Sequence, residues 1–217
     1  MGMPGSESAL EELMSRILGD LIVAGKVVKI ADDLYCGSDS LEDLLSTWSQ
    51  VLQLLSDCNL RLSASKTVIL PLTTTILGWI WNQGTLSASA HQISPLSKCD
   101  APKTVKALRS FIGAYKALSK VIEGCSHFIA PLDSLTAGRA STDKITWSDS
   151  TMSSFNGAKE SLRLAKSISI AKPSDQLWIV TDGAVKSSGI GATLYITRAN
   201  EKKPLLAGFF SAKLKQN

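Results

Sequence analysis

The sequence Lys29-Ile30-Ala31-Asp32-Asp33-Leu34-Tyr35-Cys36-Gly37 places two adjacent carboxylates between two short apolar runs. Both runs are rich in residues that favour β-strands, and the second stops at a glycine. The pattern predicts a β-hairpin with Asp32 and Asp33 at its tip. Neighbouring side chains of a strand point to opposite faces, but a turn relaxes that rule, so both carboxylates can reach one metal site. Taken alone, such a pair is more often a solvated turn.

The composition indicates a folded chain that operates inside a cell. The 217 residues, 44% of them hydrophobic and 19% charged, suffice for one large domain or two modest ones. A net charge of +4 allows nucleic-acid binding without demanding it. The four cysteines lie far apart without metal-ligand spacing, which argues against a zinc site or a disulfide framework. With no signal segment and no run of membrane-spanning length, we expect a cytoplasmic or nuclear protein without a membrane partner.

An amphipathic helix is predicted on each side of the hairpin. Residues 7–24 carry apolar side chains at helical spacing, with a capping box from Ser8 and Glu11 and a stop at Gly25. Residues 40–57 give the strongest periodic signal in the chain. A core helix is the simplest interpretation of both segments.

Short strands are predicted after the second helix, with Lys66 between the first two of them. The order of helix, hairpin, helix and strands predicts an α+β fold. The predicted strands are Leu60–Ser63, Thr67–Leu70, Thr75–Trp81 and Thr85–Ser89, and the last two are joined by a turn over Asn82–Gly84.

Helices are predicted over Thr104–Val121 and Ile129–Leu135, between a polar connector at His91–Pro102 and a linker at Ala137–Asp143. Positive side chains surround the apolar stripe of the first helix. A basic helix is more often a solvated face than a phosphate-contacting surface. The positive residues are Lys103, Lys106, Arg109, Lys116 and Lys120.

The pattern changes near residue 176, after a last helix capped by the sequence Ser148-Asp149-Ser150. Gln176–Gly183 is predicted to be an apolar strand that ends at Asp182. Further strands are predicted over Gly189–Thr197 and Pro204–Phe210. Three consecutive strands separated by turns predict an antiparallel meander that starts a new domain.

At these positions the sequence resembles the reverse transcriptase and ribonuclease H region of gypsy-type LTR retrotransposon polyproteins. Ile30-Ala31-Asp32-Asp33 is similar to the family's catalytic hairpin, whose first position is usually tyrosine. The order of the surrounding motifs is more specific than this pair and covers nearly the whole chain. The matching segments are 13–21 (palm helix), 60–66, 76–79 (primer grip), 104–113 with 130–132 (thumb and connection), and 181–184 with 189–192 (ribonuclease H hairpin).

The resemblance implies nucleotidyl transfer by two Mg²⁺ ions about 4 Å apart, held by clustered carboxylates. It assigns Asp32 and Asp33 as catalytic metal ligands of the polymerase site, and Asp182 as the first metal ligand of a ribonuclease H site. The implied partners are an RNA or DNA template–primer, deoxynucleoside triphosphates and other parts of the polyprotein. The residues implied to contact nucleic acid or the incoming triphosphate are Lys66, Gly78, Trp79, Lys106, Arg109 and Lys116.

The sequence also departs from the family's pattern. Ile30 stands where the usual tyrosine would be, which removes that contact and leaves the metal ligands intact. The family's polymerase site needs another aspartate upstream of the palm helix, and its ribonuclease H site needs further acids after the third strand. Neither set is in this chain. We therefore expect a partial enzyme that has neither activity alone and does not hold Mg²⁺ tightly, whereas a longer parent would be active.

The expected organisation is a partial polymerase palm over 1–90, a helical thumb and connection over 91–140, a linker with a connection helix over 141–175, and the first three strands of a ribonuclease H-like domain over 176–217. One alternative is a non-catalytic nucleic-acid- or protein-binding remnant of a retrotransposon polyprotein. Another is an unrelated α+β domain in which the Asp-Asp pair is only a turn.

Overall fold

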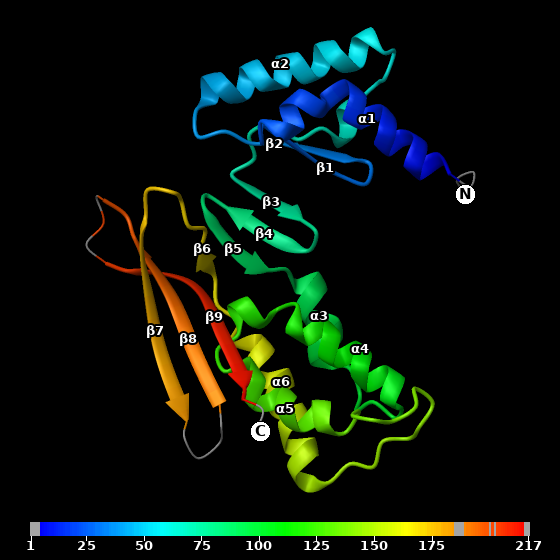
Figure 1. The fold of residues 1–217 in the computed structure, drawn as a ribbon, viewed down its shortest axis with the longest axis vertical. Helices are drawn as coiled ribbons and strands as arrows, with labels where there is room; N and C mark the ends of the chain where they lie inside the picture. Colours follow the sequence, from blue (N-terminus) through cyan, green and yellow to red (C-terminus); the bar gives the residue numbers. More distant parts are fainter. Residues whose placement is uncertain (1–4, 185–188, 200, 202, 215–217) are drawn as a thin grey trace. The chain divides into compact units, whose positions relative to one another are not determined.

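The computed structural model describes residues 5–184, 189–199, 201 and 203–214 (Figure 1). The chain divides into two compact units, Met1–Ile69 and Leu70–Asn217. This division differs from the expected boundaries at residues 90, 140 and 175. The assignment of parts of the chain to palm, thumb, connection and ribonuclease H-like domain stays a prediction.

The first unit is built from two helices and a hairpin. Its core contains Met14, Leu18 and Leu21 of the first helix, with Val27 of the hairpin and Val51 and Leu55 of the second helix. Both predicted core helices and the predicted hairpin are therefore confirmed. The elements are α1 (Ser6–Val23), β1 (Val27–Ile30), β2 (Asp33–Cys36), α2 (Leu41–Asp57) and the 3₁₀ turn η1 (Ala64–Lys66).

The ends of α1 test the predicted caps. At its C-terminus Gly25 has φ +69°, and the Gly25 and Lys26 N–H groups donate to the carbonyls of Ile22 and Leu21. This Schellman arrangement confirms the predicted stop. The predicted capping box at Ser8 is wrong, because the helix begins earlier: Gly5 is its N-cap and makes no side-chain cap.

The predicted strands at Leu60–Ser63 and Thr67–Leu70 are wrong. Both segments are irregular, and among the described residues the first unit has only the two-stranded sheet β1–β2. Side chains such as Val68 and Ile69 are more than half exposed. Their strand propensity expresses a fit to a half-buried pleated surface, and no neighbouring strand offers one here.

In its described residues, the second unit combines four α-helices with two antiparallel sheets (Figure 1). One sheet has the order β3-β4-β5-β6, and the other has the order β7-β8-β9. The helical elements are α3 (Ala90–Lys98), α4 (Val105–Lys116), η2 (Ser119–Val121), α5 (Cys125–Ser134) and α6 (Asp149–Arg163). The strands are β3 (Thr73–Ile76), β4 (Trp79–Asn82), β5 (Thr85–Ala88), β6 (Ile168–Ser169), β7 (Gln176–Ala184), β8 (Gly189–Thr197) and β9 (Leu205–Lys213).

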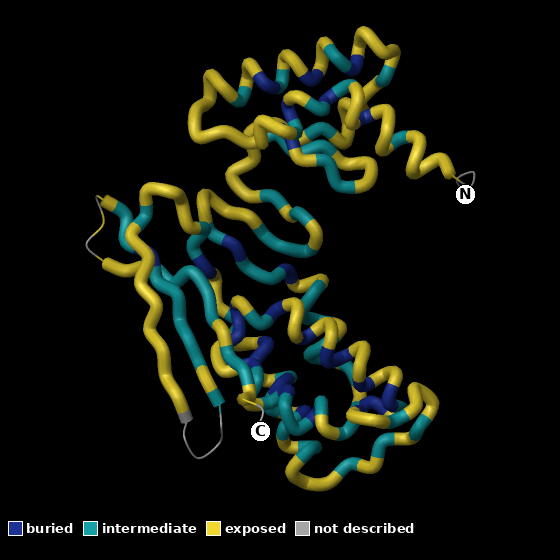
Figure 2. Tube along the Cα trace, viewed as in Figure 1, coloured by how far each residue is buried: buried dark blue, intermediate teal, exposed yellow. Residues whose placement is uncertain are grey.

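The core of the second unit is helical. Leu108 and Tyr115 of α4, Leu132 of α5 and Phe155 of α6 are almost fully buried, and Leu86 of β5 joins them. Figure 2 shows the buried positions of this unit gathered on the helices, whereas the described part of β7 is exposed along most of its length. Leu86 of β5 and Ile168 of β6 belong to this core, so the sheet β3–β6 groups with the helices of the second unit.

Three predictions for the second unit need correction. Thr75–Trp81 is not one strand, because Ile76 pairs with Trp79 and the chain reverses at Leu77–Gly78. The expected polar connector at His91–Pro102 contains helix α3, which accommodates Pro95 in its interior. The helix expected over Thr104–Val121 ends at Lys116, after which the chain tightens into η2 and buries Leu118 and Val121.

The C-terminal meander is confirmed. β8 has the predicted bounds Gly189–Thr197, and β9 continues beyond the predicted end at Phe210 as far as Lys213. The helix after the Ser-Asp-Ser cap is also confirmed as α6, with Ser148 and Thr151 forming a capping box. None of the helices in the described ranges combines the length and apolar character that a bilayer span requires.

Candidate functional site

The acid pair lies at the reversal of the β1–β2 hairpin. Ile30 pairs with Asp33, so Ala31 and Asp32 form a two-residue turn, and Ala31 has φ +50°. Both aspartates are exposed. This geometry confirms the predicted hairpin tip and leaves both carboxylates accessible.

Two contacts surround this turn. The Tyr35 hydroxyl donates to Asp33 Oδ2 at 3.3 Å. Burial, followed by the charge of Asp33 and this hydrogen bond, raises the pKa of Tyr35, which keeps the phenol in its donor form. On β1, the nearly buried Lys29 side chain forms an ion pair with Glu11 of α1. These contacts tie the hairpin to the first helix and orient one of its two carboxylates.

The donor set at the hairpin suits Mg²⁺ but is small. Mg²⁺ prefers oxygen ligands and is commonly held by one or two carboxylates together with substrate phosphates and water. Asp32 and Asp33 therefore fit part of such a site. In the described ranges, no three His, Cys, Asp or Glu side chains are grouped so that they could share a metal ion.

Lys66, the residue expected near the incoming triphosphate, is exposed in η1. The segment that carries it borders a groove of about 660 Å³ in the first unit, with both apolar and polar lining residues, which the sequence reasoning missed. Lys66 itself does not line this groove. The groove is lined mainly by Trp48, Leu52, Leu55, Leu60, Leu62 and Ile69.

Gly78 and Trp79 lie at the β3–β4 turn of the second unit. Leu77 and Gly78 both have positive φ values, +50° and +81°, as in a type I′ hairpin. Trp79 is half-buried against the helical core, and Lys120 Nζ lies 4.0 Å from the centroid of its ring. The exposed part of this turn is Leu77, a residue that is 66% exposed.

Helix α4 carries the three basic residues predicted to contact nucleic acid, and two of them have partners within the protein. Arg109 Nη2 donates to the carbonyls of Thr136 at 2.8 Å and Arg139 at 3.0 Å. Lys116 Nζ lies 2.6 Å from Asp133 Oδ2. Lys106 is exposed on the first turn of the helix.

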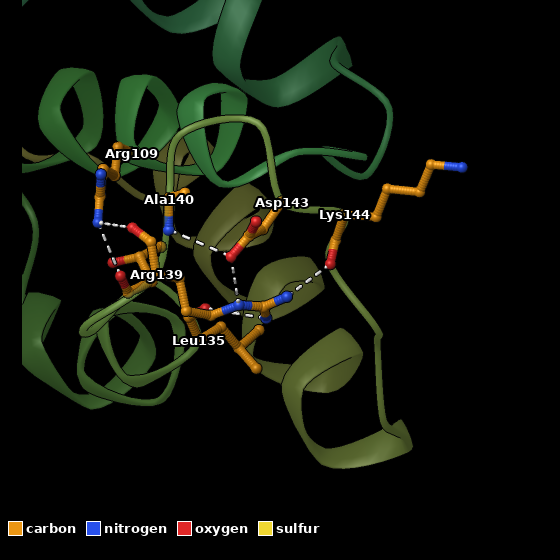
Figure 3. Close-up of polar contacts among 7 residues, drawn as sticks. Arg109, Leu135, Arg139, Ala140, Asp143 and Lys144 are labelled. Carbon is orange, nitrogen blue, oxygen red and sulfur yellow. Dashed lines mark hydrogen bonds and ion pairs between the residues drawn. The ribbon is translucent and has the colours of Figure 1, made fainter.

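The loop that Arg109 binds is held by a second arginine (Figure 3). Arg139 donates to the carbonyls of Lys144 at 2.7 Å and Leu135 at 3.4 Å, and it lies near the Asp143 carboxylate. Asp143 also accepts from the Ala140 N–H at 3.1 Å. The segment expected to be a linker at Ala137–Asp143 is therefore an ordered loop fixed by side chains.

This loop also closes the N-terminus of α4. The Val105 and Lys106 N–H groups donate to the carbonyls of Asp143 and Ser141, each at 2.9 Å. Thr104 Oγ1 accepts from the Ala107 N–H. The first free N–H groups of the helix are thus satisfied internally, so an approaching phosphate would meet side chains rather than the helix terminus.

Asp182 lies in β7, where it pairs with Gly191 of β8, and it is exposed. It belongs to the second unit, whereas Asp32 and Asp33 belong to the first. The three predicted metal ligands are therefore divided between the two units.

Comparisons with known proteins agree with the motifs. No family model matches the chain. It is 24% identical over 213 residues to the retrovirus-related Pol polyprotein from transposon opus of Drosophila melanogaster, covering 94% of this chain and 21% of that protein. It is 24% identical over 191 residues to the Gag-Pol polyprotein of avian reticuloendotheliosis virus, covering 85% of this chain and 16% of the viral protein.

The solved structures give the same result for the fold. The foamy viral protease-reverse transcriptase in complex with double-stranded DNA superimposes with a TM-score of 0.77 at 17% identity, covering 99% of this chain and 43% of the viral chain. Together these similarities confirm the α+β fold and the resemblance to a retroelement reverse transcriptase region. The chain spans only a minor share of each relative. The finer assignment of this region to gypsy-type LTR retrotransposons stays a prediction.

Proposed function

We propose that this chain is part of a retroelement RNA-directed DNA polymerase and includes the first strands of a ribonuclease H-like domain. In this proposal the intact parent extends a primer with deoxynucleoside triphosphates, and the isolated chain binds a template–primer without extending it. The observation that carries the proposal is an exposed Asp32-Asp33 pair at a hairpin reversal, in a chain similar to Pol polyproteins over most of its length.

The acid pair would supply oxygen ligands to Mg²⁺ in the parent enzyme. The chemistry supplied by Mg²⁺ held there would be activation of the primer hydroxyl and stabilisation of the leaving pyrophosphate. Asp33 would be oriented by the Tyr35 hydroxyl, and Asp32 would remain accessible at the turn. Because the described residues group no third ligand with them, the proposal assigns the remaining ligands to other parts of the polyprotein. Asp182 would belong to a separate ribonuclease H-like site, which needs added acids as well.

A nucleic-acid duplex is the proposed partner of the second unit. The foamy viral relative is bound to double-stranded DNA, which supports this choice. All three basic residues of α4 are exposed, but Arg109 and Lys116 each bind acceptors in the protein, so Lys106 is the proposed phosphate contact. The turn at Leu77–Gly78 is proposed to lie along the primer strand. The compartment in this proposal is the cytoplasm or nucleus.

The chain is expected to bind a template–primer duplex with an affinity that falls as salt rises, because each phosphate contact releases counterions. Replacing Lys106 with glutamine is expected to lower the slope of log K against log salt by about 1. Fluorescence anisotropy with a labelled duplex at several salt concentrations measures this slope. Lys26→Gln, which removes an equal charge from an exposed position in the first unit, is the matched control. An unchanged slope in Lys106→Gln, or an equal drop in the control, would contradict the assignment.

The second candidate function is a non-catalytic binding remnant. The observation that favours it is that no three potential metal ligands are grouped in the described ranges. The polymerase proposal and a nucleic-acid-binding remnant both predict duplex binding by the isolated chain, whereas a protein-binding remnant does not. A primer-extension assay on the chain with the missing polyprotein segments restored distinguishes the two candidates. Only the polymerase proposal requires extension in that assay.

A further inference from the structure

We propose that Gln92 of α3 is a positioning residue for the Leu77–Gly78 turn, and that template–primer affinity depends on it although it makes no contact with nucleic acid. The inference rests on the proposed function of this turn. Its starting point is one hydrogen bond that joins a helix to a turn distant in sequence. Gln92 Nε2 donates to the Leu77 carbonyl at 3.2 Å.

The start of α3 has the sequence of a capping box but only half of its hydrogen bonds. Ser89 is the N-cap, and its hydroxyl accepts from the Gln92 N–H at 3.3 Å. In a complete capping box the Gln92 side chain would accept from the Ser89 N–H in return. Here the Ser89 N–H donates to the Gly78 carbonyl at 3.0 Å instead. The Ser89 N–H and the Gln92 side chain, which would bond to each other in a complete capping box, both bind the turn instead.

A cost of this exchange is visible at Gln92. Its Oε1 atom is buried and has no hydrogen-bond partner in the structure. That oxygen is the atom that would have accepted from the Ser89 N–H. An unpaired buried acceptor is destabilising, and the two bonds to the Leu77 and Gly78 carbonyls offset that cost. The turn is therefore held by a specific arrangement at the helix start.

The close approach of Gln92 leaves no room for a side chain at Gly78. A Cβ atom built on Gly78 would lie 2.6 Å from Gln92 Nε2 and 2.7 Å from both Cδ and Cγ. With φ at +81°, any other residue would also be strained. A side chain at position 78 would push Gln92 away and break its bond to Leu77. The glycine and the glutamine are thus coupled through direct contact.

The consequence is a turn fixed from one side and open on the other. Gln92 and Ser89 hold its carbonyls, Lys120 covers the Trp79 ring, and the Leu77 side chain is left exposed. A strand of nucleic acid that lies along the exposed side would meet a turn that is already ordered. Losing the Gln92 bond would add the cost of ordering the turn to the cost of binding.

The test uses the full 217-residue chain, a labelled template–primer duplex and the variants Gln92→Met and Gln92→Ala. Methionine keeps the length of the side chain but cannot donate to the Leu77 carbonyl. Both variants are expected to weaken duplex binding by roughly two- to tenfold, the range that corresponds to one lost hydrogen bond. His91→Ala, an exposed neighbour on the same helix, is expected to bind as the wild type does.

A double-variant cycle and hydrogen exchange keep the test independent of simple unfolding. Gly78→Ala is expected to weaken binding less in the Gln92→Ala background than alone, because the clash has been removed. The Ser89 amide is expected to exchange faster in Gln92→Met than in His91→Ala, with or without duplex. If the wild type binds no duplex, the proposed function and the dependence of affinity on Gln92 both fail, and the exchange result then tests only whether Gln92 positions the turn. If the wild type binds and Gln92→Met matches it in affinity and exchange, the inference is overturned.

Discussion

Replacing Arg109 with alanine is expected to lower the free energy of unfolding of the second unit by about 2–3 kcal/mol. The Nη2 atom of Arg109 donates to the Thr136 and Arg139 carbonyls, and charged donors make stronger hydrogen bonds than neutral ones. Those carbonyls belong to the loop that satisfies the N-terminus of α4. Removing the guanidinium therefore deletes two hydrogen bonds and also loosens the loop that they hold.

Urea unfolding followed by tryptophan fluorescence measures this loss. Lys106→Ala is the matched control, since it removes a positive side chain from the same helix and keeps the backbone N–H that donates to the Ser141 carbonyl of the loop. It is expected to change stability by about 0.5 kcal/mol or less. Equal stabilities of Arg109→Ala and Lys106→Ala would show that the Arg109 bonds contribute nothing. Any fall in duplex affinity of Arg109→Ala is expected to follow the fall in folded fraction.

Raising the pH above about 9 is expected to cost stability through two buried groups in the helical core. Burial raises the pKa of the Cys125 thiol from 9.0 to about 11, and burial raises that of the Tyr115 hydroxyl from 10.0 to about 12. Both groups are neutral in the folded state, which holds their protons more tightly than the unfolded state does. Their contribution is fully present below pH 9 and is lost as the pH rises through 12. By linkage, each raised pKa adds about 2–3 kcal/mol to the free energy of unfolding below pH 9.

Tyr115→Phe separates this effect from other alkaline changes. The variant keeps the ring in the core and loses the hydroxyl, whose oxygen lies 2.5 Å from Ser161 Oγ. It is expected to be less stable at neutral pH, and to lose less stability than the wild type between pH 10 and 12. Urea midpoints measured at each pH give the comparison. Parallel losses in the two proteins would contradict a raised Tyr115 pKa.

Patterns with a strong local cause were predictable from the sequence. The hairpin at Asp32-Asp33 follows from two β-prone runs that meet at a polar pair. Helix α2 follows from an apolar stripe at helical spacing, and β8 from its place as a strand between two predicted turns. Gly25 ended α1 as expected, because a positive φ is needed there.

The errors arose where long-range contacts decide the structure. Residues 60–70 have strand propensity, but the described residues of the first unit offer them no strand to pair with. At 91–102 two prolines suggested a connector, although Ser89 and Gln92 carried a helix-start signal that was overlooked. The turn at Leu77–Gly78 was hidden inside an apolar run, and only the glycine indicated it.

The candidate site was predictable in its residue types and not in its contacts. The acid pair was correctly placed at a hairpin reversal because turn chemistry is local. Arg109 looked the same in sequence as Lys106, but a loop nearly thirty residues away binds it. Gln92 carried no signal on its own, since its role depends on a turn that it meets only in the folded chain.

Primer extension by the purified 217-residue chain tests the central claim most directly. The assay supplies Mg²⁺, deoxynucleoside triphosphates and a saturating template–primer, with a complete reverse transcriptase as the positive control. The account predicts no extension by the wild type beyond that of Asp32→Asn, together with binding of the same duplex by both proteins. Extension by the wild type that disappears in Asp32→Asn would contradict it, because the acid pair would then form a working site within this chain.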